Sequence, residues 1–273
     1  MSHVNIEIFN IARMQVDRDE VRRWLDHVGA TGYEIPEESA VSSPALLVAL
    51  AAKRCYMSFE PGLNPNVTKV RKDMVAYFDN ILESRHGSVL EHAVYSFALE
   101  GVSRVFTAEM NRHRAGWAIS EGSLRFIRFD KDISWWLPTS LQPNSNDDTE
   151  LTRRKLETLD VFQQAFTMQE VSYARLLKIW DMVEGHHLFH YKKVVTSCLR
   201  RIVGMGVATG GVWTGNIRAL RHVISMRAAE GAEEEIFHVF NRIAKMMKDK
   251  EPLMFGDFIQ NEHGFWAPKN WKV

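Results

Sequence analysis

The chain has 273 residues, of which 45% are hydrophobic and 25% charged, and 34 Lys and Arg balance 34 Asp and Glu. The zero formal net charge argues against the broad positive field of a general nucleic-acid-binding protein, so a basic cluster must be interpreted as a local site. Two cysteines exclude a disulfide framework and a cysteine-type zinc module. No secretory signal precedes residues 4–11 and no apolar run approaches the roughly twenty residues of a membrane span, so we expect a soluble, cytoplasmic protein.

Hydrophobic periodicity predicts the elements of the first half of the chain. Tyr95, Phe97 and Leu99 alternate with polar or small residues, which is typical of a half-buried strand. In other segments, apolar residues three or four positions apart favour helices. The predicted strands are 4–11, 93–100 and 124–129, and the predicted helices are 17–28, 44–54, 67–84 and 102–111.

The second half is richer in helix. A stretch of Pro, Asn and Asp from Pro138 to Asp148 predicts a loop. Helical spacing follows over 149–182, 191–203, 216–227 and 233–248, with a candidate strand at 207–213. Long helices together with strands that do not alternate regularly with them predict the α+β class with a mixed sheet. No linker requires a division, so one domain over 1–273 is expected.

A basic cluster lies at the end of the predicted helix 102–111. Arg-His-Arg at 112–114 is followed eight residues later by Ser-Leu-Arg at 123–125. A helix C-terminus favours one nearby cation, but three in a row exceed what capping requires. Gly116 and Gly122 predict a loop that lets the backbone approach a ligand closely. The cluster therefore predicts an anion-binding site.

Two separated blocks carry a family resemblance. Arg-His-Arg, eight residues and then Ser-x-Arg, preceded by His86-x-x-x-x-Glu91-His92, resembles the signature of the flavin-dependent thymidylate synthases. The segment from Asn216 to Arg227 resembles the second conserved block of that family, in the same order along the chain. The resemblance implies one domain with a twisted sheet and long helices, assembled as a homotetramer with active sites between subunits.

The resemblance also implies an activity. The expected reaction is the reductive methylation of dUMP to dTMP at C5, with methylenetetrahydrofolate as carbon donor, reduced FAD as hydride donor and NADPH as reductant. Cys55 and Cys198 lack the flanking motif of the cysteine-dependent thymidylate synthases, so no protein cysteine acts as nucleophile. Both cysteines are predicted to be buried small residues.

Individual residues follow from the matched motifs. The resemblance places FAD at Ser88, Arg112, His113, Arg114, Glu121, Asn216, Arg218 and His222. It places dUMP at Glu109, Arg112, Glu121, Gly122, Ser123, Leu124, Arg125, Arg201 and Arg227, with Arg201 favoured over Arg200. The implied catalytic residue is Arg227, whose charge would stabilise the deprotonated N3 of the uracil and so activate C5.

Helical geometry adds a prediction about the second block. At about 100° per residue, the segment 216–227 has two polar faces, which suggests two different neighbours. One face carries Asn216, Leu220, Val223 and Arg227, and the other carries Arg218, His222 and Ser225.

Three weaker signals are interpreted structurally. The glycines between 204 and 215 do not fit G-x-G-x-x-G, so they predict tight packing near Asn216 rather than a dinucleotide loop. His186, His187 and His190 lack a further ligand fixed by the sequence, so a polar cluster at a helix end is favoured over a metal site, and no metal is expected. Trp135, Trp136 and the tryptophans at 266–271 are predicted core or interface aromatics.

Four residues depart from the frequent family pattern, namely Glu109, Trp117, Phe126 and Gly231. They leave the substrate open, because a carboxylate at Glu109 opposes a phosphate unless it is turned away or paired. One alternative is a related transfer to C5 of a pyrimidine nucleotide, such as hydroxymethylation. Another is a non-catalytic relative that binds nucleotides or nucleic acid, against which the neutral charge argues.

Overall fold

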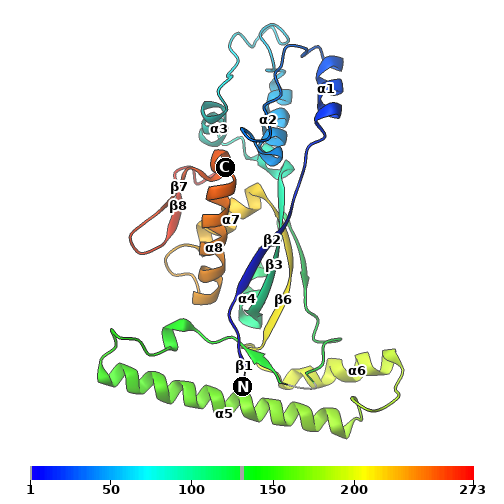
Figure 1. Cartoon of the computed structure of the whole chain (residues 1–273), viewed down its shortest axis with the longest axis vertical. Coiled ribbons are helices and arrows are strands. Elements are labelled where there is room, and N and C mark those ends of the chain that lie inside the picture. The colour runs from blue at the N-terminus through cyan, green and yellow to red at the C-terminus, as the bar shows by residue number, and fades with distance from the viewer. Residues whose placement is uncertain (1, 130–131) are drawn as a thin grey trace. The chain divides into compact units, whose positions relative to one another are not determined.

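The computed structural model describes residues 2–129 and 132–273, and contacts within the chain divide it into two compact units (Figure 1). Unit 1 contains the residues up to Phe9, Ala98–Arg112 and Ile119–Val212. Unit 2 contains Asn10–Phe97, His113–Ala118 and Trp213–Val273. The single domain over 1–273 stays a prediction.

A four-stranded sheet has the order β2-β3-β6-β4. Its strands are β2 (Glu7–Arg13), β3 (Val94–Ser103), β6 (Ala208–Asn216) and β4 (Trp117–Glu121), and each strand contributes residues to both units. Strands β3 and β6 confirm the predictions at 93–100 and 207–213. The strand predicted at 4–11 begins only at Glu7, as β2, and the short strand β1 (Ser2–His3) precedes the predicted segment. The mixture of this sheet with long helices confirms the α+β class.

Two predictions about residues 115–129 were wrong. The segment 115–120, predicted as a loop from its flanking glycines, contains β4, in which half-buried and exposed residues alternate. The strand predicted at 124–129 is absent, because the backbone turns after Ser123. The carbonyl of Ser123 accepts hydrogen bonds from the amides of Phe126 (3.0 Å) and Ile127 (2.9 Å). These backbone groups therefore bond within the turn and not to a neighbouring β-strand.

Unit 1 is organised around its longest helix, α5 (Thr149–Ile179). Strand β1 pairs in parallel with β5 (Ser134–Trp135), and the Trp135 ring stacks on Phe166 of α5 with ring centroids 4.1 Å apart. The buried cluster at this contact contains Ile133, Trp135, Leu137, Phe166 and Val207. The unit also contains α4 (Arg104–Met110), the 3-10 helix η2 (Thr139–Leu141), α6 (Phe189–Leu199) and the 3-10 helix η3 (Arg200–Ile202).

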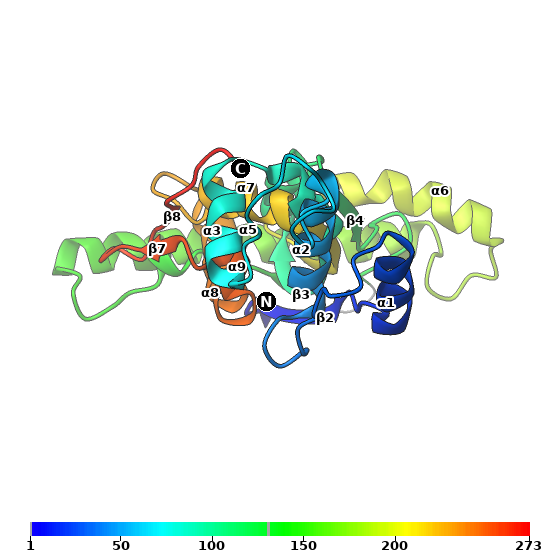
Figure 2. The same ribbon diagram turned by 90° about the horizontal axis from the view of Figure 1, so that it is seen from above.

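Unit 2 contains three helices from the N-terminal part of the chain, α1 (Arg18–His27), α2 (Ser43–Tyr56) and α3 (Met74–Glu83). In both ribbon views α2 lies between α1 and α3 (Figure 1, Figure 2). The helix predicted from 67 begins only at Met74, because the Asp73 side chain caps it by accepting from the Ala76 amide at 2.7 Å.

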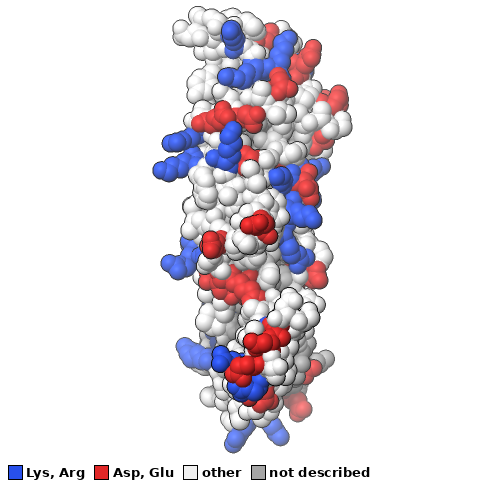
Figure 3. Space-filling view, turned by 90° about the vertical axis from the view of Figure 1, so that its left-hand side faces the viewer, with Lys and Arg blue, Asp and Glu red and all other residues white. Residues whose placement is uncertain are grey.

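The C-terminal part of unit 2 centres on α7 (Ile217–Arg227), which packs on α8 (Glu234–Lys250) and on the 3-10 helix η1 (Gly87–His92). Helix α9 (Pro252–Phe255) and an antiparallel pair, β7 (Phe258–Gln260) with β8 (Trp266–Pro268), complete it. Among the described residues, no helix combines the length and the apolar character that crossing a membrane requires. Basic and acidic side chains are interspersed on the face shown in Figure 3, in keeping with the balanced composition.

The exposure of several residues corrects the sequence analysis. Cys55 and Cys198 were predicted to be buried, but both are exposed. On α6, Val195 and Leu199 form the buried face and Cys198 lies outside it, so helical phase rather than residue type decides its exposure. Trp135, Trp136 and Trp266 are buried as predicted, whereas Trp271 is 62% exposed.

Among the described residues of unit 2, one buried basic side chain has no acidic partner. Lys53 of α2 is 2% exposed, and its Nζ lies 4.4 Å from the centre of the Tyr77 ring and 5.6 Å from that of Tyr33. Burial lowers the pKa of Lys53 from 10.5 to about 8. Burial likewise raises the pKa of the Tyr33 phenol to about 12.

We expect the stability of Lys53→Met to differ from that of the wild type in a pH-dependent way. Between pH 8 and 10.5 the unfolded wild-type chain binds more protons at Lys53 than the folded chain does, so its free energy of unfolding rises with pH. Relative to the variant, this rise should reach up to about 3 kcal/mol. Urea unfolding of both proteins across this pH range measures it, and a constant difference would contradict the burial of a titrating ammonium.

Candidate functional site

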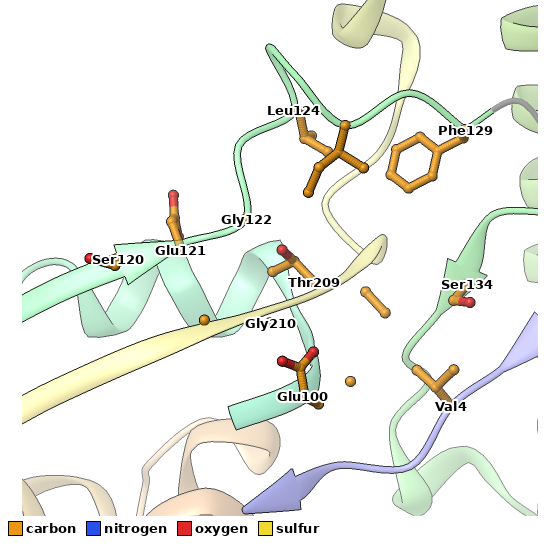
Figure 4. Close-up of a pocket in the computed structure, with 14 residues that line it drawn as sticks. Val4, Glu100, Ser120, Glu121, Gly122, Leu124, Phe129, Ser134, Thr209 and Gly210 are labelled. Atoms are coloured by element: carbon orange, nitrogen blue, oxygen red, sulfur yellow. The ribbon is translucent and has the colours of Figure 1, made fainter. Parts of the chain in front are cut away.

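A cavity of about 570 Å³ in unit 1 is lined by the end of β4 and the chain that follows it (Figure 4). Ser120, Glu121, Gly122 and Leu124 line it from this segment, and the neighbouring strand β6 contributes residues 208–211. The charged and hydroxyl side chains of the lining are Glu100, Ser120, Glu121, Ser134 and Thr209. Among the described lining residues there is no lysine or arginine, and carboxylates and hydroxyls suit a ligand that donates hydrogen bonds, such as a sugar or an amide.

Arg104, which the sequence analysis missed, fixes this wall of the cavity. Its Nη1 donates to Glu121 Oε1 at 2.8 Å, and its Nη2 donates to the carbonyl of Gly122. The two side chains are only 17% and 28% exposed, so the ion pair is partly shielded from water. Arg104 begins α4 directly after β3. A charged residue at this strand-to-helix junction is the sequence signal that could have identified it as a site residue.

Two glycines allow the strands to approach each other at the cavity. The Gly122 amide donates to the Gly210 carbonyl at 2.8 Å. A Cβ on Gly122 would lie 2.7 Å from Thr209 Oγ1, and one on Gly210 would lie 1.9 Å from Glu100 Oε2. Any side chain at either position would therefore fill the cavity or displace its wall.

The other predicted nucleotide residues of unit 1 have more open positions. Arg112 and Arg125 are exposed, and the Ser123 hydroxyl accepts from the Arg125 amide at 3.4 Å. Glu109 is half-buried on α4. Arg201 is exposed, and its Nη1 donates to the Ser197 carbonyl at the end of α6 (2.8 Å), so the favoured arginine also caps a helix.

The residues predicted for FAD in unit 2 gather around the start of α7. Asn216 caps this helix through its Oδ1, which accepts from the Ala219 amide at 2.8 Å. Arg218 pairs with Glu91 (2.6 Å) and also donates from Nε to the Val273 carbonyl at 3.2 Å. Glu91 belongs to the first motif, and no pattern in the sequence pairs it with a residue of the second block.

The predicted catalytic arginine lies at the other end of α7. Arg227 Nε donates to His113 Nε2 at 2.9 Å, and the His113 ring meets the His222 ring edge-on with centroids 6.3 Å apart. The structure thus brings one residue of the Arg-His-Arg motif into contact with the second block. Ser88, Arg114 and His222 are exposed.

The predicted face of α7 with Arg218, His222 and Ser225 borders a second cavity, of about 300 Å³, together with residues 268 and 270–273. Arg221, which was not predicted, holds this C-terminal segment through a 2.6 Å ion pair with Asp257 and a bond to the Asn270 carbonyl. Burial alone would raise the pKa of Asp257, but the hydrogen bonds and charge of Arg221 and the bonds from Asn270 hold it below its usual value.

The departures from the family pattern have structural partners. Trp117 of β4 covers Gly215, where an added Cβ would lie 2.9 Å from its ring, and it meets Phe240 edge-on at 6.4 Å. This contact confirms tight glycine packing beside Asn216. Phe126 stacks on Phe189 with centroids 5.9 Å apart, and Gly231 has a φ of +81°, a conformation that favours glycine.

Metal binding has no support in the part of the chain that the structure describes. Residues 2–129 and 132–273 contain no group of three or more His, Cys, Asp and Glu side chains placed to hold an ion.

Comparison with known sequences gives a consistent family. Residues 39–253 match the family model described as thymidylate synthase complementing protein. The chain is 30% identical over 230 residues to a flavin-dependent thymidylate synthase of Corynebacterium diphtheriae, covering 84% of each chain. It is 32% identical over 221 residues to the flavin-dependent thymidylate synthase of Mycobacteroides abscessus, covering 80% of this chain and 81% of the other.

Solved structures with the same fold come from two kinds of protein. The UMP/dUMP methylase PolB from Streptomyces cacaoi, bound with 5-Br dUMP, aligns with a TM-score of 0.63 at 15% identity, over 94% of this chain and 96% of that one. Thymidylate synthase X from Helicobacter pylori, with FAD and dUMP, aligns with a TM-score of 0.54 at 21% identity, over 78% and 93%. At these identities the likeness shows the fold alone.

The Arg104–Glu121 pair predicts a measurable coupling. Arg104→Met leaves a partly buried carboxylate without its guanidinium, so we expect the free energy of unfolding to fall by about 1–3 kcal/mol. Adding Glu121→Gln should restore part of the loss, because the uncompensated charge is then gone. Urea unfolding of the two single variants and the double variant measures the coupling. Arg54→Met, at an exposed position of α2, is the control, and additive effects of the pair would contradict the assignment.

Proposed function

Because the chain belongs to the flavin-dependent thymidylate synthases, a family of transferase enzymes, we propose that it methylates C5 of dUMP reductively to give dTMP. Methylenetetrahydrofolate is the carbon donor in this proposal, reduced FAD the hydride donor and NADPH the reductant. The observation that carries it is the family match over 39–253, which includes both motif blocks.

The residues of unit 2 suit FAD chemically. A flavin dinucleotide needs donors for its pyrophosphate and polar partners for its ring, and the exposed Ser88, Arg114, Arg218 and His222 provide hydroxyl, guanidinium and imidazole groups. The Oδ1 of Asn216 accepts the capping hydrogen bond from the Ala219 amide, and in our proposal its Nδ2 donates to the ligand. We assign these residues, with Arg112, His113 and Glu121, to FAD, which when bound supplies the hydride.

Arg227 is the proposed catalytic residue. A guanidinium remains charged at any physiological pH and can stabilise the deprotonated N3 of a uracil, which raises the electron density at C5. The bond from its Nε to His113 Nε2 fixes the direction of the side chain. The half-buried position of Arg227 strengthens this electrostatic effect relative to water.

The remaining predicted residues are assigned to the nucleotide. The exposed guanidinium groups of Arg112 and Arg125 suit the phosphate, with Arg201 or Arg200 as a further ligand. The cavity beside Glu121 and Gly122 suits the hydroxyl groups of the sugar, because its carboxylates and hydroxyls accept hydrogen bonds.

A second candidate substrate is UMP. The UMP/dUMP methylase from Streptomyces cacaoi aligns over 94% of this chain, whereas the Helicobacter pylori enzyme aligns over 78%. Glu100 and Thr209 add acceptors to the cavity that could bind a ribose 2′-hydroxyl. Methylation of the ribonucleotide is therefore a second candidate reaction, and hydroxymethylation, which concerns the transferred group, stays a separate alternative.

We also propose that the chain forms a homotetramer, using α5 as a contact surface. The buried residues Phe166, Tyr173 and Leu177 lie on one side of this helix. On the opposite side, within about 80° of one another, lie four apolar residues that are 61–67% exposed. These residues, which we call the α5 apolar face, are Val161, Met168, Val171 and Ile179. Exposed Gln164 and Arg175 share this sector, and exposed apolar side chains grouped in this way suit a protein–protein contact.

The proposed reaction is tested by the spectrum of the purified protein and the mass of its product. We expect a flavin absorbance that NADPH bleaches under anaerobic conditions. With methylenetetrahydrofolate, dUMP or UMP should gain a methyl group, and the ratio of the two kcat/KM values identifies the substrate. A colourless protein that binds no added FAD would overturn the proposal, and a hydroxymethyl product would replace it with the alternative.

In the same assay, Arg227→Ala should keep the flavin absorbance but lose at least about 100-fold in turnover, as when one electrostatic donor to a developing anion is removed. Arg242→Ala, on an exposed part of α8, is the matched control. Normal turnover of Arg227→Ala would exclude the assigned role even if the reaction itself is confirmed.

The assembly is tested separately by light scattering of the eluting protein. Val161→Glu combined with Met168→Glu should reduce the measured mass below that of four chains, because two charges would be buried in the contact. Leu151→Glu adds a charge to the same helix outside the α5 apolar face and should leave the mass unchanged. An unaltered mass in the double variant would show that this face is not a subunit contact.

A further inference from the structure

A third cavity, of about 650 Å³, lies in unit 2 and contains none of the residues assigned to flavin or nucleotide. It is formed by residues 32–36 and 40–41, the α2 residue Lys53, residues 59–61 and 70–75, and Leu253 of α9. Most of its lining is apolar or aromatic, including Tyr33, Ile35, Val41, Phe59 and Met74. Its volume falls within the range of small-molecule sites, about 300–1,000 Å³.

The buried ammonium of Lys53 is part of this lining. One of its three hydrogens has a protein acceptor, the Arg71 carbonyl at 3.1 Å, and the group otherwise faces the rings of Tyr77 and Tyr33. Ring faces attract a cation but do not neutralise it. The group therefore has hydrogen-bonding capacity and a positive charge that its own chain leaves largely uncompensated.

The acidic residues of the lining do not supply the missing charge. Glu60 accepts from the Gly32 amide at 2.6 Å, and Asp73 is the cap of α3. Glu34 is exposed, and none of the three lies within salt-bridge distance of Lys53 in the described structure. Arg71 and Lys72, which also line the cavity, add further positive charge.

The two other buried basic side chains that the structure describes each have a carboxylate. Lys155 pairs with Asp147 at 2.9 Å, and Arg221 pairs with Asp257 at 2.6 Å. Burying a cation without such a partner is costly, and the cost is recovered if an anion binds beside it. Lys53 differs from these two residues in having a cavity where they have an acid.

From this contrast we propose that the cavity is a binding site for a small organic anion, a monocarboxylate with an apolar, preferably aromatic body. The carboxylate pairs with the Lys53 ammonium, and the body packs against Phe59, Tyr33 and Met74. The site is distinct from the residues proposed for flavin and nucleotide, so its ligand is neither FAD nor the nucleotide of the proposed reaction.

The probe is 2-naphthoate, and 2-naphthalenemethanol is its neutral counterpart. Titration calorimetry of the purified full chain at pH 8, with and without added FAD, should show at least tenfold tighter binding of the acid. Binding should take up about half a proton per molecule, measured in buffers of different ionisation enthalpy, because Lys53 with a pKa of about 8 is half protonated before the anion binds.

Lys53→Met should weaken naphthoate binding at least tenfold and abolish the proton uptake, while binding of the alcohol is unchanged. Lys245→Met, at an exposed position of α8, should behave as the wild type. Ile35→Trp, which narrows the cavity without touching the charge, should weaken both probes and serves if Lys53→Met does not fold. Equal affinity for acid and alcohol, wild-type naphthoate binding by Lys53→Met, or displacement of naphthoate by FAD would each overturn the proposal.

Discussion

The contact of Arg104 with Glu121 and Gly122 fixes the chain between the two halves of the motif at 112–125. The guanidinium donates to the Glu121 carboxylate and to the Gly122 carbonyl, and these two bonds fix the backbone direction of the segment after β4. The close approach of Gly122 to Gly210 depends on the same placement, because the amide–carbonyl bond between them forms only when β4 ends at this point. The cavity wall and the turn after Ser123 both follow from it.

Helix α7 shows how one short segment can serve several tasks. Asn216 stops the strand and caps the helix, Arg221 is buried with Asp257, and Arg218 and Arg227 extend from it with Glu91 and His113 as partners. Three arginines within ten positions therefore have three different environments. Burial and an aspartate partner mark Arg221 as a structural residue, which its residue type alone does not do.

Buried charge is handled in two ways in this protein. Lys155 and Arg221 are neutralised within the chain, and Glu251, 1% exposed, accepts hydrogen bonds from Ser42 Oγ at 2.6 Å and from the Tyr95 hydroxyl. Burial is the main cause that raises the pKa of Glu251 above its usual value. Lys53 instead contacts two aromatic rings and donates one hydrogen bond, to the Arg71 carbonyl. Its unpaired charge lowers the stability of the fold, and under our proposal an anion in the adjoining cavity would compensate that charge.

The amino-acid sequence alone determined the family, the α+β class, the helices with strong periodicity and the identity of the motif residues, because each of these depends on local pattern or residue order. It did not determine β4 or the turn at 124–126. Strand β4 has flanking glycines and mixed polarity, and it forms through pairing with β6, which is distant in the chain. Only the tertiary structure decided the partners: Arg104 for Glu121, Glu91 for Arg218 and His113 for Arg227. It also decided the exposure of both cysteines and the burial of Lys53. Side-chain partners and burial arise from packing between segments far apart in the chain, and such contacts leave no periodic signal in the sequence.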